Sequence, residues 1–382
     1  MDSNFKETTK IRFAYLDNVR SLVIMLVITM HAAVTYSGMG DWYYTEGLTE
    51  NLSFFEDAFF GFYQSFLQAW FMGILFFISA YLAAKSLAKH GSFNFIKERL
   101  FRLGLPLLLY VFVVSPFILF VLLGINPGNS FVENFTMFIG NFWWLGATGP
   151  LWFVQALLIF CVFYAGLRKC FSHKIKIKYV NSVHIIFVII ITAIIAFLVR
   201  LVFPRGSSFY NLQFSYFASY IVMFIAGILI GENDLLEDIS DEKNIKWLKL
   251  SLIIGVPFWA VLMIFGGALE GKDYLFEGGF YWQSFAYALW ESLTAIGFSL
   301  GLIAVFRKKV NFENKFTGLI RDNAFGIYFF HAPILITVSL VFKNLVFNPI
   351  LKFATVTIIT SIICLIFAFL VRKIKPIGIL LK

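Results

Sequence analysis

The chain has 382 residues, of which 60% are hydrophobic and only 14% charged, whereas soluble domains average about 25% charged residues. A soluble fold of this length cannot bury so much apolar surface, so the composition predicts a polytopic membrane protein. The net charge of +9 would also fit a nucleic-acid-binding protein, but the placement of the charges along the chain gives that interpretation no support.

Ten apolar segments approach the length of about 20 residues that a helix needs to cross a bilayer. They cover roughly 18–38, 64–84, 103–124, 149–167, 181–203, 212–231, 249–268, 282–305, 322–342 and 350–371. The sequence therefore predicts an all-α fold, a polytopic transmembrane helical bundle that forms one integral-membrane domain over residues 1–382. The aromatic loop at 39–63 suits an interfacial lid or belt.

The basic residues are distributed unevenly between the two sides of these spans. If the N-terminus is inside, 26 of the 31 lysines and arginines fall on the inner side and 5 on the outer side. This asymmetry is the positive-inside pattern, and it is lost if one span is removed. We therefore expect both termini to be cytoplasmic. The three cysteines have no pairing or metal-type spacing, so we expect neither a disulfide framework nor a metal site.

The first span, in the stretch "LDNVRSLVIMLVITMHAA", carries a cation and a titratable ring. Arg20 and His31 are eleven residues apart, which places them on one helix face about 16 Å apart along the axis. A histidine can accept a proton from a hydroxyl nucleophile, and a water-filled cavity would give it that use. The alternatives are an arginine that anchors the span at the headgroups and a core histidine bonded to a neighbouring carbonyl.

Further polar residues are expected at a similar depth in other spans. These are Glu291, His331, and Gln155 one turn from Trp152. A lone ionised carboxylate would be strongly disfavoured there, so Glu291 should be neutral, paired or hydrated. Such groups can serve helix packing alone. Their common depth with His31 favours a shared cavity.

A second feature lies at the predicted cytoplasmic boundary, in "FIKERLFRLGLP". Arg99 and Arg102 are one turn apart, and two guanidinium groups can form a fork for phosphate or pyrophosphate. The alternative is anchoring of the span to lipid headgroups.

Taken together, these segments resemble the acyltransferase 3 family of bacterial integral-membrane acyltransferases. "LDNVR" followed by ten residues and a histidine resembles the family's opening. The later segments "FFISAYL", "RLFRLGLP", "LWFVQALLIF" and "FGIYFFHAPIL" are similar to its further motifs, in the same order. Ala80 stands where the family usually has glycine. The stretch "HAAVTYSGMGDWYY" looks most like the branch of glucan-modifying acyltransferases.

The resemblance implies a membrane O-acyltransferase that uses cytoplasmic acyl-coenzyme A. The acyl group would be acetyl, with succinyl as an open alternative, and the acceptor a hydroxyl of an extracytoplasmic glycan or glycolipid. The protein would lie among the lipids of the bacterial cytoplasmic membrane. We expect no fused soluble esterase-like domain, so that any further transfer would be completed within the membrane unit or by a separate extracytoplasmic partner protein. A proton-coupled transporter or a lipid-linked glycan flippase is the competing function.

The family's roles carry over to matching positions of this sequence. His31 would be the catalytic histidine, and Glu291 and His331 would orient it or relay its proton. The other expected contacts are Arg20, Arg99 and Arg102 for the coenzyme A donor, and Gln155 and Trp152 for the substrate or the developing oxyanion.

Overall fold

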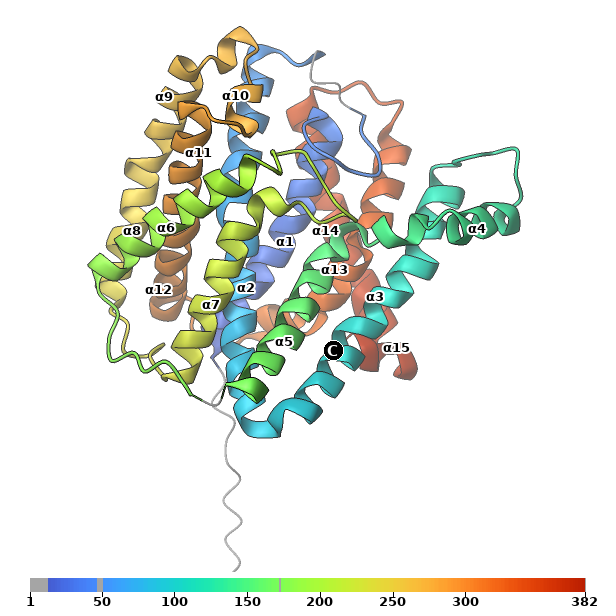
Figure 1. The fold of residues 1–382 in the computed structure, drawn as a ribbon. Helices are drawn as coiled ribbons and strands as arrows, with labels where there is room; N and C mark the ends of the chain where they lie inside the picture. The colour runs from blue at the N-terminus through green and yellow to red at the C-terminus, as the bar shows by residue number, and fades with distance from the viewer. Residues whose placement is uncertain (1–12, 47–50, 172, 382) are drawn as a thin grey trace, which may run out of the picture.

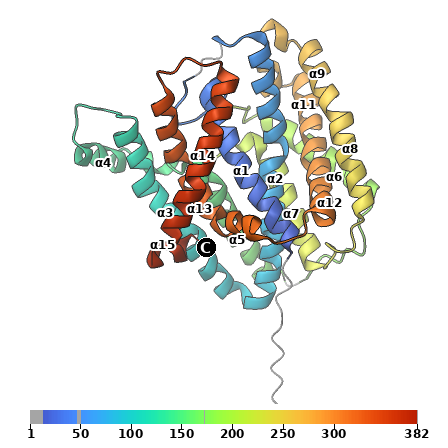
Figure 2. The same cartoon turned by 180° about the vertical axis from the view of Figure 1, so that it is seen from behind.

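The computed structural model describes residues 13–46, 51–171 and 173–381, and it is drawn from two sides in Figures 1 and 2. Within these ranges the chain is helical, and the β-type pairing is limited to an isolated bridge between Phe209 and Leu212. The first helices are α1 (Ala14–Ser37), α2 (Phe54–Arg99), α3 (Leu105–Leu109), α4 (Phe131–Gly140), α5 (Trp152–Cys170), α6 (Ser182–Arg200) and α7 (Phe217–Glu232). The later helices are α8 (Asp241–Ile253), α9 (Gly255–Gly266), α10 (Tyr274–Glu277), α11 (Trp282–Leu293), α12 (Ser299–Lys309), α13 (Lys315–Phe342), α14 (Pro349–Arg372) and α15 (Lys375–Leu380).

Nine helical stretches in the described part of the chain are long and apolar enough to cross a membrane. The prediction of a polytopic helical bundle is therefore confirmed. Each of the ten expected ranges overlaps one of these stretches, because the longest of them, Phe54–Leu122, takes in two of the ranges. Large apolar side chains such as Phe187 on α6 and Phe265 on α9 point outward, as expected for helices surrounded by lipid.

The second and third expected spans are joined without a loop. The helical hydrogen bonding continues from α2 into α3, through π-helical turns at Leu100–Gly104, but Gly91 leaves the helical conformation with φ 72° and ψ 164°. That positive φ is readily available only to glycine. The chain reverses direction in this region, so α2 and the stretch through α3 run past each other in opposite directions (Figure 1).

The tightest helix contact is between α2 and α7. A Cβ atom added at Gly227 would lie 2.3 Å from the carbonyl oxygen of Phe77 and 2.8 Å from the Cβ of Ala80. One added at Gly231 would lie 3.0 Å from the Cβ of Ala84. Small residues four apart on both helices let the backbones approach closely, which is how membrane helices gain packing energy. The methyl group of Ala80 therefore fits because α7 presents a glycine opposite it.

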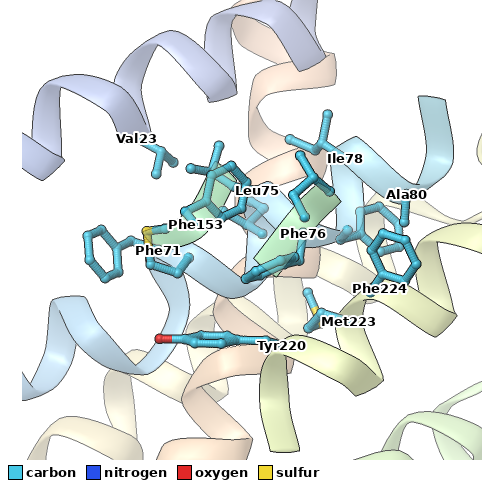
Figure 3. Close-up of a cluster of buried hydrophobic side chains, with 14 of the residues drawn as sticks. Val23, Phe71, Leu75, Phe76, Ile78, Ala80, Phe153, Tyr220, Met223 and Phe224 are labelled. Carbon is cyan, nitrogen blue, oxygen red and sulfur yellow. The ribbon is translucent and has the colours of Figure 1, made fainter. Parts of the chain in front are cut away.

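An apolar layer fills the middle of the bundle (Figure 3). At its centre Phe76 is fully buried and packs on Phe153, with ring centroids 4.7 Å apart, and on Tyr220, at 5.1 Å. The other labelled members of this layer are Val23 of α1, Phe71, Leu75, Ile78 and Ala80 of α2, and Met223 and Phe224 of α7.

The two ends of the bundle differ in composition. One end holds the α2–α3 reversal, the end of α5 and the connection from α12 to α13, and it carries most of the described lysines and arginines. We call it the basic end. The opposite end, which we call the loop end, holds residues 38–46, 201–216 and 267–281.

Candidate active site

A cavity of about 1420 Å³ lies at the loop end. Its walls come from α1, α2, α4, α5, α7, α9, α10, α11 and α13, from the stretch after α3 and from the loops of that end, and on α1 it reaches down to Val27. His31 and Tyr328 therefore lie in its wall. The volume exceeds the range of about 300–1,000 Å³ that is common for pockets binding small molecules. The site therefore has room for an extended ligand.

Two histidines that are 300 positions apart in the sequence meet at the cavity wall, where His31 lines the cavity and His331 lies buried behind it. His31 of α1 and His331 of α13 face each other, with Nδ1 of His31 3.1 Å from Nε2 of His331. His331 is fully buried, and its Nδ1 lies 2.6 Å from the carbonyl oxygen of Tyr328. The expected similar depth of the two histidines thus appears in the structure as a direct hydrogen bond.

When both rings are neutral, this chain of hydrogen bonds assigns their protons. A carbonyl oxygen only accepts, so Nδ1 of His331 carries the hydrogen that it donates to Tyr328. Nε2 of a neutral His331 is then an acceptor, and Nδ1 of His31 must donate to it. The lone pair of His31 is left on Nε2. His31 is therefore held in the tautomer that a general base requires, with His331 as the group that orients it.

Aromatic rings enclose the histidine pair. The indole of Trp42 stacks on the imidazole of His31, with ring centroids 3.9 Å apart and an interplanar angle of 22°. Tyr328 stacks beside His331 at 5.8 Å and 22°, and its hydroxyl donates a hydrogen bond to the carbonyl oxygen of Pro150. The pair thus lies between rings that are themselves anchored. The sequence placed Trp42 only in an aromatic loop and did not single out Tyr328, although Tyr328 lies one helical turn before His331 and its spacing could have revealed it.

The rest of the cavity wall combines aromatic faces with uncharged hydrogen-bonding groups. Its aromatic residues include Trp152, Tyr216, Tyr220, Trp259 and Tyr287, and its amides are Gln64, Gln68, Asn211 and Gln213. Four carboxylates, Asp41, Asp57, Asp273 and Glu277, and one cation, Arg205, also line it. Arg205 lies over the ring of Tyr287, 4.3 Å from its centroid.

Glu291 does not join the histidine pair. It forms an ion pair with Arg200 of α6, with Nη2 2.5 Å from Oε2, and both side chains are buried. Arg200 also donates from Nε to the carbonyl oxygen of Ser215 at 3.1 Å. The expectation that Glu291 would be paired agrees with this arrangement. A role in orienting His31 does not, because that position is taken by His331, and the sequence offered no signal that would match Arg200 with a carboxylate 91 residues later.

Trp152 lies in the cavity wall, and Gln155 does not. Trp152 lines the cavity and stacks on Tyr220, with ring centroids 5.5 Å apart. Gln155, one turn further along α5, lies outside the cavity wall, and its Oε1 is buried without a hydrogen-bond partner among the described residues. Trp152 is thus in a position to contact a cavity ligand, whereas Gln155 is not.

The three arginines lie towards the basic end, away from the cavity. Arg20 is 3.5 Å from Asp17 and is close enough to Arg99 for their charges to repel. The guanidinium of Arg99 lies 5.1 Å from the ring centroid of Phe95. Arg102 is more exposed and bridges to Glu98 at 3.3 Å. Because the charges of Arg20 and Arg99 repel each other, an anionic ligand beside them would be favoured.

In the part of the chain that the structure describes, no three histidine, cysteine or acidic side chains come together in a way that could hold a metal ion. The cysteines Cys161, Cys170 and Cys364 are free.

Comparison with known proteins identifies the family. The family model of an acyltransferase domain, Acyl_transf_3, matches residues 13–369. The chain therefore belongs to the acyltransferase 3 family, and it is an acyltransferase embedded in a membrane by several helices. Neither the curated proteins nor the solved structures include a significant match.

Proposed function

We propose that this protein transfers an acyl group, acetyl in the first instance, from acyl-coenzyme A to a hydroxyl group of a glycan or glycolipid. The observation that carries this proposal is the His31–His331 pair, whose hydrogen bonds leave Nε2 of His31 as a base in the wall of a large cavity. A transporter needs no such fixed tautomer, and the acyltransferase family of the chain favours transfer chemistry.

In the proposed reaction, His31 removes the proton of the acceptor hydroxyl while the hydroxyl oxygen attacks the thioester carbonyl. The carbon–sulfur bond breaks as the oxyanion collapses, and the coenzyme A thiolate leaves and takes up the proton from His31. The imidazolium formed in between is stabilised because His331 accepts its Nδ1 hydrogen. Both products are then neutral at the reacting atoms, and His31 returns to its starting state.

The cavity supports a carbohydrate as the acceptor. Flat aromatic faces such as Trp152 and Tyr220 can stack on sugar rings, and amides such as Gln64 and Asn211 can exchange hydrogen bonds with hydroxyl groups. The volume of about 1420 Å³ is larger than one sugar and an acetyl group require. An oligosaccharide or the head of a glycolipid fits these properties.

The donor is proposed to bind at the basic end. Coenzyme A carries phosphates, and the charges of Arg20 and Arg99 influence each other at this end. The positive-inside asymmetry supports a cytoplasmic location for this end, in a bacterial cytoplasmic membrane. The acceptor would then enter from the extracytoplasmic side, where the cavity lies.

Thioester cleavage by purified protein tests the proposal. The protein, in detergent or lipid nanodiscs, is incubated with labelled acetyl-coenzyme A and a neutral gluco-oligosaccharide, and both free thiol and labelled sugar are measured. We expect His31→Ala to abolish both signals without changing expression or the gel-filtration profile. The matched control is His90→Ala, which removes an exposed histidine at the basic end. Full activity of His31→Ala would refute the assignment.

A further inference from the structure

We propose that Trp42 is a positioning residue for the reaction, because its indole holds the imidazole plane of His31 and stabilises the imidazolium that forms during transfer. This inference rests on the proposed function. It assigns a role to a loop residue that was not among the expected site residues.

The geometry of the two rings carries the inference. Their centroids are 3.9 Å apart and their planes differ by 22°, so the indole covers one face of the imidazole. Nε2 of His331 contacts the edge of the His31 ring at its Nδ1. The face and the edge are therefore both occupied, and the imidazole cannot flip without displacing one of these neighbours. A cation over an indole face is also attracted by the ring quadrupole, most strongly where water is excluded.

The backbone brings Trp42 to this position by folding residues 38–46 back over the end of α1. The helix ends at Gly38, whose φ of 70° turns the chain, and the amide of Glu46 donates a hydrogen bond of 2.8 Å to the carbonyl oxygen of Thr35. The carboxylate of Glu46 is paired with Lys352 of α14, which is buried. Both ends of this short segment are thus fixed to the helical bundle.

Tyr43 provides a second anchor directly beside the indole. Its ring meets that of Trp42 edge to face, with centroids 5.3 Å apart. Its hydroxyl occupies space that only a glycine leaves open, since a Cβ atom at Gly149 would lie 2.3 Å from it. Gly149 has a φ of +47°, which also disfavours any other residue. The position of Trp42 is therefore built into the fold.

The unpaired indole nitrogen of Trp42 argues against a role in packing alone. Nε1 of Trp42 is buried and has no hydrogen-bond partner among the described residues. An indole N–H in such a place is costly, and a phenyl ring would fill the position without that cost. The tryptophan is explained by its larger π surface, which binds cations better than phenylalanine does.

The test compares Trp42→Phe and Trp42→Leu with the wild type in the acetyl-coenzyme A assay, measuring kcat and the acceptor KM separately. We expect Trp42→Leu to lower kcat by about 2- to 30-fold, the range from an exposed to a desolvated cation–π contact. Trp42→Phe should recover most of this loss, and the acceptor KM should stay within about 2-fold. Trp42→Met replaces the leucine variant if that variant aggregates on gel filtration.

The outcomes separate this inference from the proposed function. An unchanged kcat in Trp42→Leu, or an equal loss in Trp42→Phe, would overturn the role of Trp42. A change confined to the acceptor KM would also overturn it and would make Trp42 a sugar contact. If His31→Ala keeps its activity, the proposed function itself fails, whatever the Trp42 variants do.

Discussion

Replacement of His331 with alanine should slow acyl transfer without abolishing the fold. The hydrogen bond from Nδ1 of His31 to Nε2 of His331, 3.1 Å long, becomes a charge-assisted bond when His31 takes up the proton of the acceptor. Hydrogen bonds to charged groups contribute about 1.5–3 kcal/mol. At about 1.36 kcal/mol for each factor of ten, loss of this bond should lower kcat by roughly 10- to 160-fold.

The assay is thiol release from acetyl-coenzyme A under saturating acceptor, with kcat as the readout. His331→Gln is the informative companion, because its amide can donate to the Tyr328 carbonyl while its oxygen accepts from His31, as the imidazole does. We expect this variant to keep more activity than His331→Ala. The reasoning is refuted if His331→Ala stays within about 2-fold of the wild type, or if both variants lose activity equally. His90→Ala serves again as the control.

Two further changes test the packing around the site. Arg200→Met should destabilise the protein by about 3–5 kcal/mol, because it leaves the buried carboxylate of Glu291 without its partner. The double variant with Glu291→Leu should recover most of the thermal unfolding temperature. Gly227→Ala should cost about 1–3 kcal/mol by forcing α7 away from the carbonyl oxygen of Phe77, whereas Gly166→Ala, with open space around it, should be neutral. Equal unfolding temperatures for the two glycine variants would contradict the close α2–α7 contact.

The fold was predictable because the bilayer imposes one length on every span. Apolar stretches of about 20 residues can be counted directly, and the resulting ranges overlap the helices that the structure contains. The turn between α2 and α3 was less accessible. The expected spans end at residue 84 and resume at residue 103, whereas helical structure covers most of the interval and the chain changes direction at a single glycine, Gly91. Local composition does not show where a helix bends through one residue.

The sequence predicted the depth of the site residues in the membrane, but it did not predict which side chains pair with each other. Distances from the basic boundary placed His31 and His331 at one level, and the structure joins them by a hydrogen bond. Depth alone could not decide which neighbour Glu291 has, because helix order around the bundle determines that α11 packs on α6 and presents the carboxylate to Arg200. Trp42 was hidden for a similar reason. Its contact depends on a loop that folds back on α1, and such a loop has no periodic signature.

The arrangement along α1 gives the proposed reaction its direction. Arg20 and His31 mark a donor end and a base about 16 Å apart on one helix. Between them Val23 is fully buried and Val27 nearly so, and both belong to the buried apolar cluster of the bundle. Phosphates cannot enter such a layer without a large desolvation penalty, whereas an uncharged thioester arm can. Under the proposed reaction, the charged part of the donor would be retained at the basic end while the thioester arm brings its acyl end to His31. The acceptor would then stay in the cavity, and the phosphates of the donor would not cross the apolar layer.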